Sequence, residues 1–150
     1  MPRATARRLR VVILAAEFYP SLTRALVQGA SAVLRRHGLP GANIRVLGVP
    51  GTFELPVAAA RVAAHRPKPD AIIALGTLIR GQTPQYEVIA HAVAHGLTQV
   101  SVSSRIPITF GVIVAHTLAQ AKARAGPGLG NRGAEAALAA LELLSVLDSF

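Results

Sequence analysis

Hydrophobic residues along this chain fall into two alternating patterns. Short continuous apolar runs are typical of strands buried on both faces of a parallel sheet, and they predict strands at residues 9–16, 44–49, 71–75 and 106–114. Between these runs, apolar residues recur every three or four positions, which indicates amphipathic helices. We expect the helices from Pro20 to just before Gly38 and over residues 54–65, 83–99, 117–125 and 133–147, the last capped by Asn131 or a neighbour.

Strand and helix alternate four times, and one more helix follows. This order predicts an α/β fold in three layers (αβα), with a four-stranded parallel sheet, right-handed crossovers and helices on both faces. A chain of 150 residues suits a single domain. We therefore expect residues 1–150 to fold as one unit, with residues 1–8 as a flexible basic N-terminal segment.

The segment after the third strand is the most informative part of the sequence. In DAIIALGTLIRGQTPQYE (70–87), a buried run passes into a loop that begins at Gly76 and then into a helix. Thr83 is expected as the N-cap of that helix and Pro84 in its first turn. Free backbone N–H groups and the positive helix end, with the charge of Arg80 beside them, predict a site for a phosphate group.

Other candidate residues follow the strands, where ligands bind in open parallel sheets. Phe18 and Phe53 come just past strand ends, so each could stack on a flat ligand or cap the core of the sheet. Glu54 could accept a ligand N–H or serve as a first-turn helix charge. His91 and His95 share a helix face, but no third ligand has a recognisable spacing, so we predict no metal site.

Composition narrows the class of protein. Hydrophobic residues make up 51% of the chain and charged residues 15%, which excludes a disordered tail and suggests that surface is buried against further copies of the chain. No apolar run is long enough to span a bilayer, so no membrane partner is expected. The chain has no cysteine and no recognisable targeting segment, and we expect a cytoplasmic location.

The formal net charge of +9 raises the question of a nucleic-acid partner. The basic residues are scattered along the sequence, aromatic residues are only 4%, and there is no tryptophan to stack on bases. We therefore expect no nucleic-acid partner and interpret the charge as that of a basic protein with an anionic substrate.

Six segments in order resemble the lumazine synthase (6,7-dimethyl-8-ribityllumazine synthase) family over about residues 11–147. They are Phe18 after the first strand, VPGTFELP (49–56), ALGTLIRGQT (74–83), ITFGVIV (108–114), QAKARAG (120–126) and GNRGAEAALAALE (130–142).

The resemblance implies a flavodoxin-like fold in pentamers, decamers or icosahedral shells, with active sites between neighbouring subunits. It also implies a transferase of riboflavin biosynthesis. Such an enzyme condenses 5-amino-6-(D-ribitylamino)uracil with 3,4-dihydroxy-2-butanone 4-phosphate to give 6,7-dimethyl-8-ribityllumazine, phosphate and water. No cofactor is implied, and riboflavin synthase is a further partner to expect.

The resemblance also assigns substrate contacts to residues of this sequence. The residues that would contact the pyrimidine and its ribityl chain follow the first three predicted strands. They are Phe18, Thr52, Phe53, Glu54, Thr77, Leu78 and Ile79. Phe18 would stack on the pyrimidinedione ring. Gln82 and Thr83 match the phosphate-binding pair. Phe110 and Arg124 would come from the adjacent subunit, with Arg124 acting in catalysis as the ion-pair partner of the phosphate.

Three positions depart from the family pattern. Tyr19 stands where the family usually has asparagine, and Arg132 where it has lysine. The third is Gln85, at the position of the family's proton-transferring histidine. Glutamine hydrogen-bonds but does not transfer protons at useful pH. His116 could replace that histidine, either from its own loop or from a neighbouring subunit.

General acid–base catalysis contributes ~10²–10⁴-fold to a rate, whereas orientation of two reactants contributes roughly 7–11 kcal/mol. We therefore expect a working, possibly slow synthase. The alternative is a non-catalytic flavin-binding or shell-forming paralogue.

Overall fold

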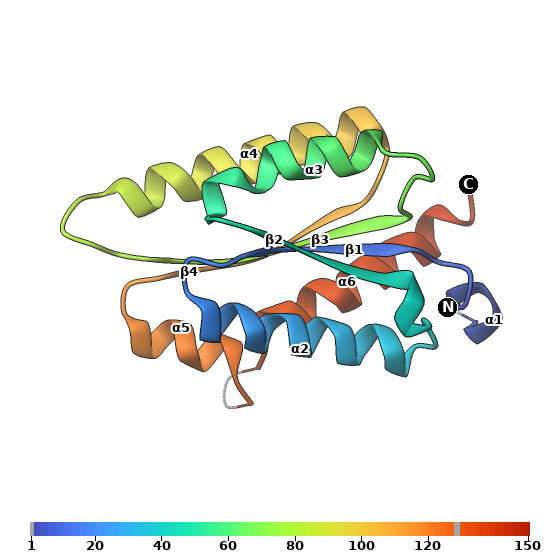
Figure 1. Cartoon of the computed structure of the whole chain (residues 1–150), viewed down its shortest axis with the longest axis horizontal. Helices are drawn as coiled ribbons and strands as arrows, with labels where there is room; N and C mark the ends of the chain where they lie inside the picture. Colours follow the sequence, from blue (N-terminus) through green and yellow to red (C-terminus); the bar gives the residue numbers. More distant parts are fainter. Residues whose placement is uncertain (1, 128–129) are drawn as a thin grey trace.

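A four-stranded parallel sheet separates two layers of helices in the computed structural model of the chain, which describes residues 2–127 and 130–150 (Figure 1). The strands are β1 (Val11–Ala16), β2 (Ile44–Val49), β3 (Ala71–Ile79) and β4 (Ile108–Ala115), in the spatial order β2-β1-β3-β4. The helices are α1 (Arg3–Ala6), α2 (Pro20–Arg36), α3 (Leu55–Ala64), α4 (Gln85–Ser104), α5 (Leu118–Ala125) and α6 (Arg132–Leu147). The predicted three-layer α/β fold is confirmed.

The two faces of the sheet carry separate cores. In Figure 1, α3 and α4 lie above the sheet, and α2, α5 and α6 lie below it. Side chains alternate along the central strand β3, so that Ile73 and Leu75 pack on the α2–α6 side while Ile72 and Ala74 pack on the α3–α4 side. Burial on both faces explains why the sequences of β1 and β3 are continuous apolar runs. The edge strand β2 does not fit the expectation of burial on both faces, because Arg45 and Val46 are exposed.

The third strand is longer than predicted. It continues through Gly76 to Ile79, because these residues pair with Val112 to Ala115 of β4 in parallel register. The prediction that a loop begins at Gly76 was therefore wrong. Pairing with β4, which is not visible in the local pattern, keeps the strand extended past the glycine.

The start of α4 also differs from the prediction. The helix begins at Gln85 with Pro84 at the N-cap, so Thr83 lies outside it and is not the cap. The first helical hydrogen bonds go to the Pro84 carbonyl, which accepts from the N–H groups of Glu87 at 3.1 Å and Val88 at 3.3 Å, so the helix starts one residue later than predicted. The helix ends at Ser104 rather than near residue 99, and Arg105 closes it in the left-handed conformation (φ 60°).

The first residues carry structure that the sequence pattern does not predict. The short helix α1 spans Arg3–Ala6, and Ala6 is fully buried in the α2–α6 core. The Asn43 side-chain amide donates to the Arg7 carbonyl at 3.0 Å. These contacts fasten the segment that was expected to be flexible to the start of β2.

Candidate active site

A cavity of about 330 Å³ opens where β1, β2 and β3 end. Parallel strands bring their carboxyl ends to one edge, so residues far apart in the sequence share this wall. The cavity brings together nine of the predicted site residues: Phe18, Thr52, Phe53, Glu54, Thr77, Leu78, Ile79, Thr83 and Gln85.

Two threonines form a tightly packed part of the wall. Thr52 and Thr77 are both buried, and the Thr52 hydroxyl donates to the Thr77 carbonyl at 3.5 Å. A Cβ on Gly76 would lie 2.8 Å from Thr52 Oγ1, so this close approach requires glycine. Among the described residues, the buried Thr77 hydroxyl has no hydrogen-bond partner. An unpaired hydroxyl at a cavity wall favours a ligand with polar groups.

Two phenylalanines line the cavity with their rings in solvent. Phe18 is 72% exposed and Phe53 is 62% exposed, so neither caps the core of the sheet. The Phe18 ring meets Tyr19 edge-on, with centroids 5.0 Å apart. Exposed aromatic rings beside a cavity can stack on a flat ligand. Glu54 adds a carboxylate that can accept ligand N–H groups.

A second cavity of about 280 Å³ lies beside the loop between β3 and α4. Gln82 lines this cavity and not the first, whereas Gly81, Thr83 and Tyr86 line both. Arg80 supplies a positive charge to the second cavity. Glu87 lines the second cavity as well, so this cavity is polar and holds charges of both signs. The loop therefore presents backbone between an apolar cavity and a polar one, which suits a ligand with a ring and a phosphate.

Sequence reasoning missed Tyr86, which stands between the two cavities. Its hydroxyl donates to Glu87 Oε1 at 3.1 Å, and its ring centroid lies 6.2 Å from that of His116. Burial and the Glu87 carboxylate raise the pKa of Tyr86 above its ordinary value, against an opposing effect of Arg80. Tyr86 therefore stays a neutral phenol at neutral pH. The sequence clue that could have identified Tyr86 as a site residue was its position next to Gln85, at the start of a helix.

The candidate replacement for the missing histidine does not share the cavity of Gln85. His116 follows β4 and lines the second cavity with Gln82 and Thr83. Tyr86 stands between it and the first cavity. His91 and His95 are exposed on α4, and no group of three potential metal ligands occurs in the described part of the chain.

Two predicted site residues lie outside both cavities. Phe110 is on β4 and 41% exposed, and Arg124 is exposed in the last turn of α5. Both were expected to act in the site of a neighbouring subunit. Their position in one chain is compatible with that prediction and leaves it untested.

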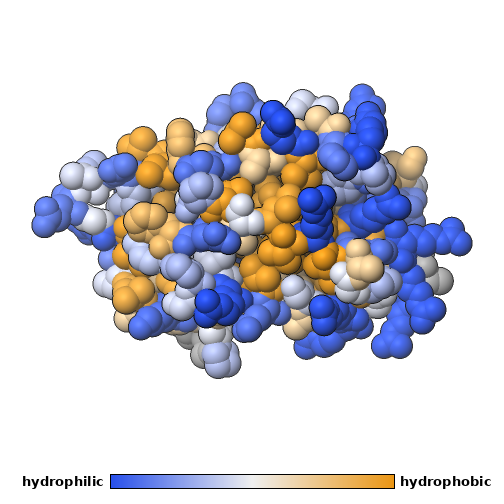
Figure 2. Space-filling model, in the orientation of Figure 1, coloured by the Kyte–Doolittle hydropathy of each residue, from blue (hydrophilic) through white to orange (hydrophobic). Residues whose placement is uncertain are grey.

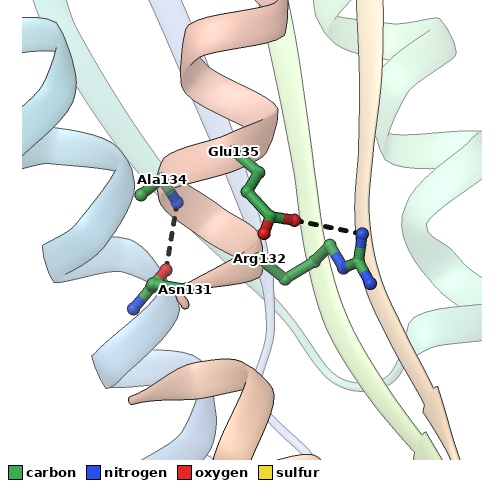
Figure 3. Close-up of polar contacts among 4 residues, drawn as sticks. All are labelled: Asn131, Arg132, Ala134 and Glu135. Atoms are coloured by element: carbon green, nitrogen blue, oxygen red, sulfur yellow. Dashed lines mark hydrogen bonds and ion pairs between the residues drawn. The ribbon is translucent and has the colours of Figure 1, made fainter. Parts of the chain in front are cut away.

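Asn131 joins three helices next to Arg124. Its Oδ1 accepts from the Ala134 N–H at 3.0 Å and so caps α6, as predicted (Figure 3). Its Nδ2 donates to the carbonyls of Ala25 in α2 and Ala125 in α5, both at 3.0 Å.

The first turn of α6 also holds an ion pair, in which Arg132 Nη1 lies 3.0 Å from Glu135 Oε2 (Figure 3). Both side chains are about half-exposed, so the pair adds little to stability and leaves the guanidinium accessible.

The fold and the cavity define a class of α/β protein that binds a small ligand beyond the carboxyl ends of its parallel strands. The family model described as 6,7-dimethyl-8-ribityllumazine synthase matches residues 8–148, and the chain belongs to this family.

Curated relatives agree with this assignment. The chain is 46% identical to the 6,7-dimethyl-8-ribityllumazine synthase of Aquifex aeolicus, over 98% of this chain and 95% of that protein. It is 44% identical to the one of Gemmatimonas aurantiaca, over 98% and 88% of the two chains. The corresponding protein of Thermus thermophilus is 41% identical over 99% of this chain and 94% of that one.

Within the described residues, no helix combines the length and apolar character needed to cross a membrane.

Proposed function

We propose that this chain is a 6,7-dimethyl-8-ribityllumazine synthase. It joins the amine of 5-amino-6-(D-ribitylamino)uracil to the ketone of 3,4-dihydroxy-2-butanone 4-phosphate, with release of inorganic phosphate and water. The observation that carries the proposal is the single cavity formed by segments that match the family from Phe18 to Gln85.

The cavity offers a place for each part of the pyrimidine substrate. The exposed rings of Phe18 and Phe53 give the heteroaromatic ring a stacking surface. Glu54 accepts hydrogen bonds from N–H or hydroxyl groups, and Thr77 adds a buried hydroxyl that has no hydrogen-bond partner among the described residues. Most of these groups sit on or next to strands of the sheet, which fixes their positions.

The phosphate substrate belongs at the loop before α4. Backbone N–H groups of Gln82 and Thr83 and the positive end of a 20-residue helix favour a phosphate there. Arg124 of an adjacent subunit completes the site in this proposal. An arginine next to a phosphate makes strong charge-assisted hydrogen bonds.

The enzyme is an oligomer of five subunits or a multiple of five in this proposal. Phe110 and Arg124 lie outside the cavities of their own chain, so a complete site needs a second copy. Figure 2 shows apolar residues open across the middle of one face, as expected for a surface that packs against a neighbour. A cytoplasmic location, an icosahedral shell and an association with riboflavin synthase stay predictions that rest on the family resemblance.

Product formation from the two purified substrates, followed by fluorescence, tests the activity. The rate must exceed the uncatalysed background, and failure to do so contradicts the proposal. A non-catalytic flavin-binding paralogue is not supported, because the reported relatives all carry the synthase name and Gln85 was its only basis. Sedimentation at micromolar concentration tests the assembly, and a stable monomer or dimer contradicts the shared site.

The role of Arg124 has its own test. Arg124→Ala should raise the KM for the butanone phosphate roughly 10- to 100-fold and leave that for the pyrimidine nearly unchanged, since a hydrogen bond to a charged group contributes about 1.5–3 kcal/mol. Lys122→Ala is the matched control, because both cations lie in the last turn of α5. Equal effects on both substrates would remove Arg124 from the phosphate site.

A further inference from the structure

The fold gathers basic residues that are scattered in the sequence. Every strand of the parallel sheet begins at one end of the molecule, and α2, α3 and α4 end there, since each runs back from the carboxyl edge. Eleven of the 16 lysines and arginines belong to this end: Arg3, Arg7, Arg8, Arg10, Arg35, Arg36, Arg45, Arg61, Arg66, Lys68 and Arg105. We call these eleven residues the basic end.

Contacts between segments hold the basic end together. Besides the bond from Asn43 to the Arg7 carbonyl, the Arg10 N–H donates to the Asp70 carboxylate at 2.7 Å. The Arg35 guanidinium reaches Gly41, which precedes β2. The segments before β1, before β2, before β3 and after α2 therefore meet at one surface. Figure 2 shows strongly hydrophilic residues on the same side as α1 and the chain termini in Figure 1.

Little negative charge balances the basic end. Among the described residues, three carboxylates lie near it: Asp70, Asp148 and Glu142, the last of which lines a cavity with His37 at the end of α2. Glu17, Glu54, Glu87 and Glu135 lie at the opposite end, beside the cavities and the start of α6. All eleven basic side chains are exposed. The ion pair found in residues 2–127 and 130–150 joins Arg132 to Glu135, away from this surface. Nearly all of the net charge of +9 therefore sits here, unpaired.

Helix ends explain only part of this arrangement. Cations in the last turn of a helix are favourable against its dipole, which accounts for Arg35, Arg36 and Arg61. The dipole does not account for the four arginines of residues 3–10, for Arg45 in the edge strand β2, or for the loop before β3. Their common property is exposure on one surface.

The residue types favour phosphate as the partner group. Ten of the eleven are arginine, whose planar fork matches phosphate oxygens better than the lysine ammonium does. The cavities described above lie at the other end of the molecule. Exposed cations from several segments, none of them in the ion pair of the described residues, suit an extended chain of phosphates rather than a small molecule.

We propose that the basic end binds the phosphate backbone of nucleic acid without sequence preference. The expectation of no nucleic-acid partner rested on charges scattered along the sequence, and the fold removes that argument. Of the aromatic residues that the structure describes, only Phe150 is near this end, so base stacking contributes little and binding is through phosphates. This surface is separate from the proposed synthase site, and the proposal does not depend on that activity.

Fluorescence anisotropy of a labelled duplex of random sequence tests the proposal. Affinity should fall steeply between about 50 and about 200 mM salt, because each phosphate contact adds roughly −0.9 to the slope of log K against log salt. Arg35→Glu with Arg36→Glu should weaken binding at the lower salt roughly tenfold or more and reduce that slope by about 2. Arg66→Glu with Lys68→Glu, on a different segment, should act in the same direction.

The control makes the same change in charge at the other end. Arg24→Glu with Lys122→Glu alters two exposed cations of α2 and α5 outside the basic end, and should weaken binding less than about threefold. Equal losses in the control and the basic-end variants, or no binding at the lower salt, overturn the proposal. Tighter binding to vesicles of anionic lipid than to duplex also overturns it. Synthase activity should be unchanged in the basic-end variants.

Discussion

Replacing Asn131 by alanine tests how far one side chain holds α2, α5 and α6 together. The side chain makes three hydrogen bonds, each 3.0 Å long, to α6, α5 and α2. Loss of an N-cap costs about 1 kcal/mol. The Ala125 carbonyl is one of the last four of its helix and loses its partner, which costs about 1 kcal/mol more. With the bond to Ala25, the expected loss in free energy of unfolding is about 2–3 kcal/mol.

The measurement is denaturation followed by circular dichroism at a fixed protein concentration. For a domain of this size the loss corresponds to a fall in Tm of roughly 5–10 °C. Thr117→Ala is the matched control, because Thr117 caps α5 by a single bond from the Gln120 N–H and should cost about 1 kcal/mol. If Asn131→Ala costs no more than Thr117→Ala, the bonds to α2 and α5 contribute nothing and the reasoning is refuted.

A second substitution checks the same junction from α2. A Cβ on Gly29 would lie 2.3 Å from the Asn131 Oδ1, so Gly29→Ala should displace that side chain and destabilise the protein. In the Asn131→Ala background the clash partner is gone. In the Asn131→Ala protein, Gly29→Ala should therefore be neutral or stabilising, since alanine is a better helix former than glycine by about 1 kcal/mol. Additive effects of the two changes would show that the residues do not interact.

Two further predictions concern the cavity. Gln85→His should raise turnover roughly tenfold or more, within the ~10²–10⁴ range of general acid–base catalysis, and introduce a pH dependence between about 6 and 8, measured by steady-state kinetics. An unchanged rate together with abolition by His116→Ala would instead assign proton transfer to His116. Gly76→Ala should cost about 1–3 kcal/mol in thermal unfolding, because the new Cβ would lie 2.8 Å from Thr52 Oγ1. A Tm equal to that of the parent protein would show that the wall can relax.

Local patterns in the sequence determined the elements and their order. Continuous apolar runs and a spacing of three to four predicted the four strands and five of the six helices found in residues 2–127 and 130–150, since burial on one or both faces dictates those periods. Asn131 and Thr117 were identifiable as helix starts because capping is a local interaction. The alternation of strands and helices was enough for the three-layer fold.

The edge of the sheet that holds the cavity was also predictable. Residues at or just after the carboxyl ends of parallel strands meet at one edge, and for this reason Phe18, Phe53 and Thr77 line one cavity. The sequence could not show that Gln82 and His116 face a second cavity across Tyr86. That division into two cavities depends on how the loop before α4 packs. The local hydrophobic pattern of the sequence carries no information about this packing.

Tertiary structure decided the features that depend on pairing between distant segments. Pairing with β4 keeps β3 extended past Gly76, although the local sequence pattern predicts a loop that begins at this glycine. Packing against the α2–α6 core buries Ala6 in a segment whose arginines indicate solvent. The sequence set the amount of positive charge, but only the parallel topology placed Arg7, Arg35 and Arg66 at one end, because charge alone carries no information about which segments become neighbours.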